Sequence, residues 1–439
     1  MVSADYGTTM NLISFLGPTD YSKTTYVLGD KRHSTKFFPA ALGQFIKPER
    51  VLIFCTPTVK SHHNLVQLTD ELRDQGMKAE PIDIPDGHDE RDLWLIFDAL
   101  TENISENDTV VFDITHSFRS LPFLAFLAVA YLKAAKHVQV DGIFYGAYEA
   151  RVEERNETPV LDLTPFASLL DWLTATRRFV DTGDGKDLSD LLEAGMPPGI
   201  QRKDDVSARK LAKHLQRAAD AINGVSQALS LARPIETMAS AAALKQTLLE
   251  AAPSIEEQAR PFAVLTDRVM EEYGQFAIGD RSDETSATPG ATYIDNQLDM
   301  INWYLLRRQT VQAVTLSREW LVSVLAFQWQ RDMYKYKGQG GRQEIEHALG
   351  NALEQTKPSP NPRYQPSECD TLIQKMPDQV RRDIVAAWDV ITKLRNDIAH
   401  AGMMKKRLTA AQIQKKAHNV YAKLRGIATH FLPSHSIEP

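Results

Sequence analysis

The sequence predicts a Rossmann-like α/β domain with a mostly parallel sheet, followed by an all-helical region. Over residues 1–164, short apolar runs alternate with segments of helical spacing, which is the pattern of right-handed strand–helix–strand units. After about Thr164 the apolar runs largely disappear, and helical spacing continues through most of the remaining chain. Polar turns follow several of the apolar runs, at the place where open parallel sheets bind their ligands.

Composition narrows the class of protein. The chain has 439 residues, enough for two or three domains, and an ordinary composition for a soluble globular protein. Its two cysteines, Cys55 and Cys369, argue against a disulfide framework and suit a reducing cytosol. The first residues do not resemble a signal peptide, and the longest apolar run, Leu121–Leu132, is too short to span a bilayer. We therefore expect a cytoplasmic protein that does not associate with membranes.

The strands expected in the first domain are apolar runs that end in turn residues. They are Asn11–Leu16, Val51–Cys55, Ala79–Ile84, Thr109–Asp113, Val138–Tyr145 and Pro159–Leu163. Helices are expected at Lys36–Ile46, Ser61–Gln75, Asp89–Ile104 and Leu121–Lys136. His62-His63 is interpreted as a helix start, because neither Cys nor a paired carboxylate lies at metal-ligand spacing. Neither GxGxxG nor GxxxxGK[ST] occurs, which argues against a dinucleotide-binding domain and a P-loop NTPase.

The second region is expected to be helical throughout. The predicted helices are Phe166–Val180, Val206–Leu231, Ala239–Leu249, Ile255–Tyr273, one or two over Asn296–Tyr334, Gln379–Leu394 and Thr409–Phe431. Loops are expected at Gly279–Thr292, Gly338–Gly341 and Lys357–Pro366, which are rich in Gly, Pro and small polar residues.

One stretch, Val110–Pro122, combines a strand end, a polar turn and the start of an apolar helix. Such a turn aims backbone N–H groups and a helix N-terminus at an anion, so we expect a phosphate-bearing ligand there. The alternative is an ordinary helix cap built from Asp113 and Thr115.

The residues Asp113-Ile-Thr115-His116-Ser117 resemble the DxTHG motif of CRISPR-associated proteins. In that family a CARF sensor domain binds cyclic oligoadenylate and a HEPN domain cuts RNA. Ser117 stands where the motif has Gly, and Ser is less suited to a backbone with positive φ. The resemblance extends over about residues 10–180 and 300–405, and is poor over 200–290.

The resemblance implies a set of ligand-binding residues in the first domain. The ligand would be cyclic oligoadenylate, the tetra-adenylate rather than the hexa-adenylate. The expected contacts are Gly17, Thr56, Thr115, His116, Ser117 and Arg119. Asp113 is expected to hold the turn, and Tyr145 and Tyr148 are interpreted as packing residues.

Charge is distributed unevenly along the chain. The net charge is −7, yet residues 381–430 hold eleven Lys and Arg against three Asp, a balance of +8 that leaves −15 elsewhere. A basic segment on an acidic protein is typical of a polyanion-binding surface. The alternative is a solvated helix face with extended lysines.

Within that segment, Arg395-Asn396-Asp397-Ile398-Ala399-His400 resembles the RxxxxH signature of HEPN ribonucleases. Asn396 and His400 are i and i+4 and share a helix face, whereas Arg395 lies about 140° round from His400. Histidine supplies a general acid or base near neutral pH, and a guanidinium supplies positive charge to a phosphate. The alternative is a surface arginine beside an ordinary histidine.

Together these motifs predict a sensor over 1–164, a helical first part of the effector over 165–295 and a HEPN core over 296–439. The expected activity is metal-independent cleavage of single-stranded RNA in type III CRISPR antiviral defence, switched on by cyclic oligoadenylate, with Arg395, Asn396 and His400 as catalytic residues. No metal or cofactor is expected. The partners would be the activator, the RNA and a second copy, with a higher oligomer left open. Two alternatives remain: a regulator that binds nucleic acid without cutting it, and a sensor that also degrades its activator.

Overall fold

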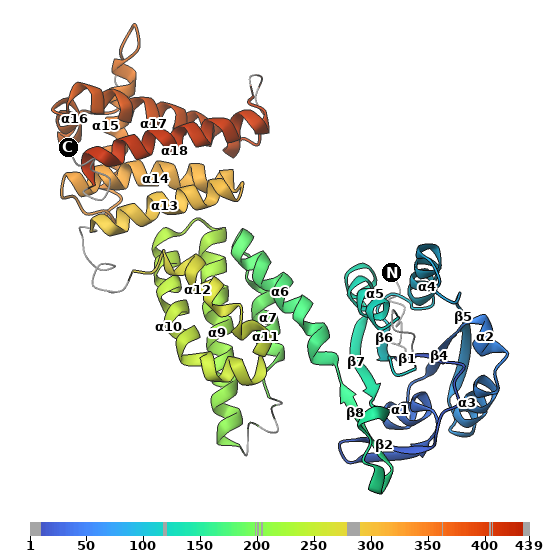
Figure 1. Ribbon diagram of the computed structural model, residues 1–439. Helices are drawn as coiled ribbons and strands as arrows, with labels where there is room; N and C mark the ends of the chain where they lie inside the picture. Colours follow the sequence, from blue (N-terminus) through green and yellow to red (C-terminus); the bar gives the residue numbers. More distant parts are fainter. Residues whose placement is uncertain are drawn as a thin grey trace, which may run out of the picture. The chain divides into compact units, whose positions relative to one another are not determined.

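The computed structural model of this chain describes residues 10–116, 121–197, 205–278, 290–361, 363–403 and 407–432, with the single residues 199, 202 and 405. The chain divides into two compact units, Met1–Asp171 and Trp172–Pro439. The first unit contains a sheet with helices on both faces, and the second is helical (Figure 1).

The first unit is built on one sheet. Among the described residues the order of its strands is β3-β2-β8-β7-β6-β1-β4-β5. The strands are β1 (Met10–Phe15), β2 (Thr24–Leu28), β3 (Lys31–Thr35), β4 (Arg50–Cys55), β5 (Lys78–Asp83), β6 (Thr109–Asp113), β7 (Gln139–Gly146) and β8 (Glu157–Asp162). Only the β2–β3 and β7–β8 pairs are antiparallel. The predicted mostly parallel α/β sheet is therefore confirmed.

The strand order reverses at β1. This strand pairs in parallel with β4 on one side and with β6 on the other, with Asn11 opposite both Arg50 and Val110. The carboxyl ends of β1 and β6 therefore lie side by side, at the switch point where open α/β sheets form their ligand crevice.

Each face of the sheet is covered by two main helices, α1 (Phe38–Ile46) and α3 (His63–Asp74) on one and α4 (Glu90–Glu102) and α5 (Leu121–Lys136) on the other (Figure 1). Alternate residues of β4 point to opposite layers because side chains alternate along a strand. One layer buries Val51, Ile53, Phe38, Leu42, Leu68 and Leu72. The other buries Leu52, Phe54, Ile96, Leu100, Ala128 and Leu132.

The hairpin formed by β2 and β3 was not predicted. β3 (Lys31–Thr35) exposes most of its side chains, so it lacks the apolar run by which the other strands were found. The turn between the two strands is Gly29-Asp30, and Gly29 adopts a φ of 58°, where glycine is favoured. A Gly-Asp pair directly after the short run Thr24–Leu28, which is rich in Thr, Tyr and Val, is the signal that could have identified it.

The second unit is helical, as predicted. From the helix that enters it, its helices are α6 (Thr164–Thr182), α7 (Lys186–Ala194), α9 (Val206–Ser230), α10 (Pro234–Gln258), α11 (Arg260–Ala263), α12 (Thr266–Gly274), α13 (Ala291–Leu306), α14 (Thr310–Gln328), α15 (Arg342–Gln355), α16 (Glu368–Gln374), α17 (Asp378–Ala399) and α18 (Ala410–Phe431). The stretch 296–334 forms two helices, separated at Arg308, whose φ is 57°. α7, α15 and α16 were not predicted. In the part of the chain that the structure describes, none of the helices has both the length and the apolar character to cross a membrane.

A half-buried ion pair joins α12 to α13 inside the second unit. Arg307, directly after α13, pairs with Glu272 of α12, and its guanidinium lies 4.1 Å from the centre of the Trp303 ring. The same guanidinium donates to the carbonyl of Val180, at 3.0 Å from Nη2. Glu272 also accepts from the indole N–H of Trp303. One arginine thus ties three helices together, including α6.

Replacing Arg307 by methionine should lower the stability of the second unit by about 1–3 kcal/mol, because it leaves the Glu272 carboxylate and the Val180 carbonyl without their charged donor. Tryptophan fluorescence during urea unfolding would measure this, since five of the six tryptophans follow Asp171. Arg177→Met is the matched control. Its pair with Asp181 is exposed and should contribute less than about 1 kcal/mol. Equal effects of the two changes would contradict the prediction.

Candidate functional site

The turn after β6 is held by a buried carboxylate. Asp113 has no exposed surface. Its Oδ2 accepts from the Ser14 hydroxyl at 2.7 Å, and its Oδ1 accepts from the Thr115 N–H at 2.8 Å. Burial raises the pKa of Asp113 to about 6, although the hydrogen bonds from Ser14 and Thr115 act to lower it. Asp113 therefore links the carboxyl end of β1 to the turn after β6.

Thr115 and His116 extend this arrangement. The Thr115 hydroxyl oxygen accepts from the Gly146 N–H at 2.8 Å, which ties the turn to the end of β7. The His116 ring lies on Tyr21, with ring centres 4.1 Å apart, and its Nε2 accepts a long contact from the Phe38 N–H at 3.5 Å. Burial lowers the pKa of His116 to about 4. The imidazole is therefore neutral near pH 7 and brings no positive charge to a ligand.

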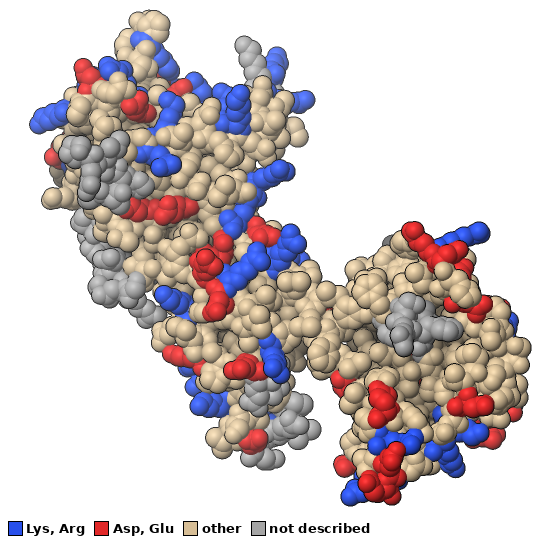
Figure 2. All heavy atoms as spheres, in the orientation of Figure 1, with Lys and Arg blue, Asp and Glu red and all other residues tan. Residues whose placement is uncertain are grey.

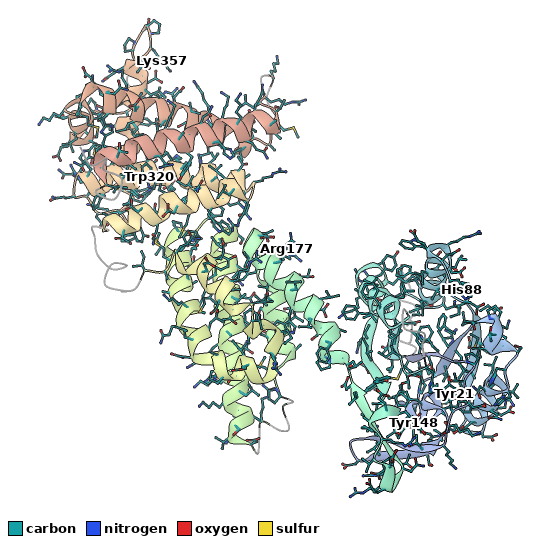
Figure 3. The ribbon with its side chains drawn as sticks, in the orientation of Figure 1. Tyr21, His88, Tyr148, Arg177, Trp320 and Lys357 are labelled. Atoms are coloured by element: carbon teal, nitrogen blue, oxygen red, sulfur yellow. The ribbon has the colours of Figure 1, made fainter. Side chains whose placement is uncertain are left out.

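A pocket of about 250 Å³ opens beside these two residues. It is lined by Asp20, Tyr21, Ser22, Tyr26, Lys36, Thr115, His116, Tyr145, Gly146, Tyr148 and Glu149. Figure 3 labels Tyr21 and Tyr148, which come from the segment after β1 and from the segment after β7. Five of the eleven lining residues are aromatic, and the lining also includes two carboxylates and one lysine.

Glu149 is held in place at this pocket. The Tyr145 hydroxyl donates to Glu149 Oε1 at 2.6 Å. Burial, with the neighbouring Glu149 carboxylate, raises the pKa of Tyr145 to about 12, so the phenol remains a donor. Tyr145 and Tyr148, which the sequence led us to interpret as packing residues, both line the pocket. Their position just after an apolar strand end is the signal that could have identified them.

Gly17 and Thr56 do not line the pocket, although both were predicted to bind the ligand. The Gly17 N–H donates to the Tyr21 hydroxyl at 2.9 Å, and a Cβ on Gly17 would lie 2.8 Å from that oxygen. Gly17 thus positions Tyr21. Thr56 follows β4, is 2% exposed, and its Oγ1 has no hydrogen-bond partner among the described residues. Ser117 and Arg119 lie outside the described residues.

The second predicted cluster lies at the carboxyl end of α17. Arg395, Asn396 and His400 are all exposed. The helix ends here because Ala401 and Gly402 adopt left-handed φ values of 49° and 69°. Figure 2 shows Lys and Arg side chains gathered around the α17–α18 pair, as the charge balance of this segment predicts.

Asp397, inside this motif, is a structural residue. It is 4% exposed, and its Oδ2 accepts from the Leu408 N–H at 3.1 Å. Its backbone carbonyl accepts from the Gly402 N–H at 3.1 Å. The residue therefore fixes the chain that leaves α17 and returns as α18. This role was not predicted, although an acid two residues before the last residue of the helix, with Gly402 five residues further on, was a local signal for it.

Asn396 borders a groove of about 460 Å³, which is also lined by Asp389, Val390, Lys393, Leu394, Asp397, Leu408 and Lys416. Arg395 and His400 do not line this groove. Helix geometry puts Arg395 on a different face from His400. One chain therefore does not converge all three predicted catalytic side chains on one groove.

Comparison with known proteins gives two family matches. Residues 11–149 match the CARF domain of the CRISPR system endoribonuclease Csx1, and residues 168–282 match the second domain of the CRISPR-associated protein MJ1674. Residues 11–149 are therefore similar to a CARF domain, and the strand-end pocket lies within these residues. The predicted resemblance to CARF-containing CRISPR-associated proteins is thereby confirmed.

Two individual proteins are similar to this chain. The CRISPR-associated protein MJ1674 of Methanocaldococcus jannaschii is 32% identical over 110 residues, which is 24% of this chain and 17% of the relative. The chain thus matches about a sixth of that relative's length. The solved structure of Enterococcus italicus Csm6 bound to cyclic hexa-2'-fluoro-hexa-dAMP aligns over 98% of this chain and 96% of that one, with 12% identity and a TM-score of 0.43.

The raised pKa of Asp113 should be visible in the pH dependence of CARF-domain stability. The folded pKa of about 6 lies above the ordinary value of 3.8. Protonation therefore favours the folded state, and the stabilisation is lost as pH rises from about 4 through 6. Over that range the wild type should lose up to about 3 kcal/mol that Asp113→Asn does not lose. Calorimetric unfolding between pH 4.5 and 7.5 would measure the difference, and parallel profiles of the two proteins would contradict the assignment.

Proposed function

We propose that this protein is an endoribonuclease of type III CRISPR antiviral defence that is switched on by cyclic oligoadenylate and cuts single-stranded RNA without a metal ion. The observation that carries the proposal is the combination of two sites in one chain. A CARF domain has a solvent-facing pocket at its strand ends. A separate helical unit exposes Asn396 and His400, one helical turn apart, at the end of α17.

The chemistry of the CARF pocket suits a nucleobase better than a phosphate. Tyr21 and Tyr148 offer aromatic faces on which a base can stack. Glu149 can accept hydrogen bonds from an exocyclic amine such as that of adenine. The carboxylates of Asp20 and Glu149 outnumber the one lysine of the lining, Lys36, and His116 is neutral, so the lining as a whole disfavours a phosphate. We therefore assign the pocket to one adenine of the ring, with its phosphates outside.

The size of the pocket supports a homodimer. A volume of about 250 Å³ lies below the usual range of about 300–1,000 Å³ for a pocket that encloses a whole ligand. One pocket holds only part of a cyclic oligonucleotide. A two-fold symmetric ring would therefore be shared between two identical pockets, one from each copy.

An exposed apolar face on the CARF domain also supports association. Phe123, Leu127 and Tyr131 are spaced by four residues along α5 and are 67%, 42% and 49% exposed. Trp94 and Leu95 of α4, which contacts α5, are 61% and 46% exposed. Apolar clusters of this kind mark interaction surfaces in soluble proteins. We assign this face to the contact with the second copy.

RNA carries its own nucleophile, and this determines what the protein must supply. The 2'-oxygen attacks the adjacent phosphorus, and the bond from phosphorus to the 5'-oxygen breaks. The 2'-hydroxyl loses its proton, and the departing 5'-oxygen gains one. His400, present once in each chain of the composite site, would accept the first proton as general base or donate the second as general acid. Arg395 stabilises the charge on the pentacoordinate phosphate, and Asn396 orients it. The products are a 2',3'-cyclic phosphate and a free 5'-hydroxyl. Because Arg395 and His400 lie on different faces, the complete site is composed from two chains.

Activation requires the ligand to favour one arrangement of the dimer over another, since equal affinity for two states would shift neither. Helix α6 (Thr164–Thr182) is suited to carry the signal. Its Ala167 packs in the CARF core, and its Trp172 and Phe179 pack in the core of the helical unit. A change in its first turns can be transmitted along one continuous hydrogen-bonded helix.

Replacing His400 by alanine should abolish RNA cleavage and leave activator binding intact. The assay follows a labelled single-stranded RNA in EDTA, with no activator, with cyclic tetra-adenylate and with cyclic hexa-adenylate. We expect cutting with one ring, the tetra-adenylate, and at least a hundredfold loss in the variant. His418→Ala is the matched control, because His418 is also exposed and lies on α18.

Other outcomes of this assay separate the alternatives. Cutting by His400→Ala at the native rate would refute the catalytic assignment. RNA binding that is salt-dependent but never followed by cleavage would favour the non-cutting regulator. If the His400→Ala variant still degraded the cyclic activator, hydrolysis of the ring would be assigned to the CARF domain. His116 is poorly suited to that reaction, because its low pKa keeps it unprotonated and its Nε2 contacts the Phe38 N–H.

Replacing Tyr148 by leucine should weaken activator binding about tenfold or more, because stacking of a base on an aromatic ring contributes about 1–3 kcal/mol. Calorimetric titration would measure the affinity. Tyr336→Leu, at a tyrosine 53% exposed in the second unit, is the control. Equal activator affinities of the wild type and Tyr148→Leu would contradict the assignment of a base to this pocket.

A further inference from the structure

Three potential metal ligands from distant parts of the sequence meet beside the CARF pocket. Asp20, His62 and His63 each place one ligand atom within 4.8 Å of the others. His63 Nε2 lies 3.4 Å from Asp20 Oδ1, and the two imidazole rings lie 4.1 Å apart. Sequence inspection missed the group because its carboxylate lies more than forty residues before the histidines.

A buried side chain holds the two segments in register. Asn64 is 2% exposed and donates through Nδ2 to the carbonyls of Gly17, at 3.2 Å, and Thr19, at 2.8 Å. These bonds fasten the segment that carries Asp20 to the first turn of α3, next to both histidines. The backbone segments that carry the three side chains are therefore held together, while the side chains of Asp20 and His63 themselves are exposed.

The chemistry of this ligand set points to a divalent transition metal. Imidazole and carboxylate bind Zn²⁺ with bonds of about 2.0–2.2 Å, which places two ligand atoms of a tetrahedron about 3.4 Å apart. The separation of His63 from Asp20 matches this edge. Three protein ligands leave a fourth position open, as in sites that exchange water or substrate.

We infer that Asp20, His62 and His63 form a binding site for Zn²⁺ at the rim of the CARF pocket. His62 Nδ1 accepts from the Asn64 N–H at 3.3 Å, so Nε2 would coordinate after the ring proton moves to Nδ1. That gives up one long hydrogen bond, which is a small loss beside a metal bond. The carboxylate is essential, because the N-terminus of α3 itself disfavours a cation.

The site would influence ligand binding through Asp20, which also lines the pocket. Zn²⁺ would neutralise this carboxylate and so reduce its repulsion of ligand phosphates. Metal and ligand would then raise each other's affinity by the same factor. This consequence rests on the proposed function, whereas the metal site itself does not.

The test uses the full chain, stripped of metal by a chelator and dialysed. Zn²⁺ binding is measured by equilibrium dialysis, and Co²⁺ binding by its absorption spectrum. We expect one metal per chain in the wild type, and at least tenfold weaker binding in Asp20→Asn, His62→Asn and His63→Gln. His62→Asn retains a side chain that can cap α3, so an unchanged melting temperature without metal would show an intact fold.

His88→Asn is the matched control, because His88 is an exposed histidine that lies apart from Tyr21 on the same unit (Figure 3). Undiminished binding in the three variants, or an equal loss in His88→Asn, would overturn the site. Activator affinity in the presence and absence of Zn²⁺ is measured separately in the wild type and in His63→Gln. If Zn²⁺ binds but does not raise the affinity for the activator, only the proposed coupling would be refuted.

Discussion

The candidate ligand site depends on one buried carboxylate. Asp113 accepts hydrogen bonds from β1 and from the turn after β6, at the point where the strand order reverses. Its burial is costly, as the raised pKa shows. In return the turn has one conformation, in which Thr115 reaches the end of β7 and His116 lies against Tyr21. The charge thus fixes the position of the pocket wall without contacting the pocket itself.

The sequence was sufficient for the parts of the fold that depend on local pattern. Buried parallel strands are apolar runs, and the helices that cover them have regular spacing, so the sheet and the role of Asp113 could be predicted. The remaining pocket walls could not. Tyr21, Tyr148 and Glu149 come from connecting segments whose meeting depends on the sheet order. The polar β2–β3 hairpin had no apolar run, and the Asn64 bonds to Gly17 and Thr19 join segments with no common pattern.

For the motif Arg395–His400, the sequence revealed more than it did for the pocket. Its residues are adjacent in sequence, so helix periodicity alone placed Asn396 and His400 on one face and Arg395 on another. The sequence did not show that Asp397 between them is buried and holds the loop to Leu408. An exposed motif anchored by a buried neighbour is rigid yet open to a second chain. Because the helix holds Arg395 and His400 on different faces, the proposed joint action of the two on one phosphate would require a residue from a second chain.

On the proposed function, charge explains how one chain can hold both a site for the cyclic activator and a site for the RNA substrate. On the proposed function, both ligands are polyanions built from the same nucleotides, so phosphate recognition alone would let cellular RNA compete for the sensor. The CARF pocket instead places two carboxylates, Asp20 and Glu149, against one lysine and several aromatic rings, which would favour a displayed base over a phosphate chain. The basic segment 381–430, with a charge balance of +8, would on the proposed function attract the RNA backbone instead. Opposite electrostatics would therefore keep activator and substrate at their own sites.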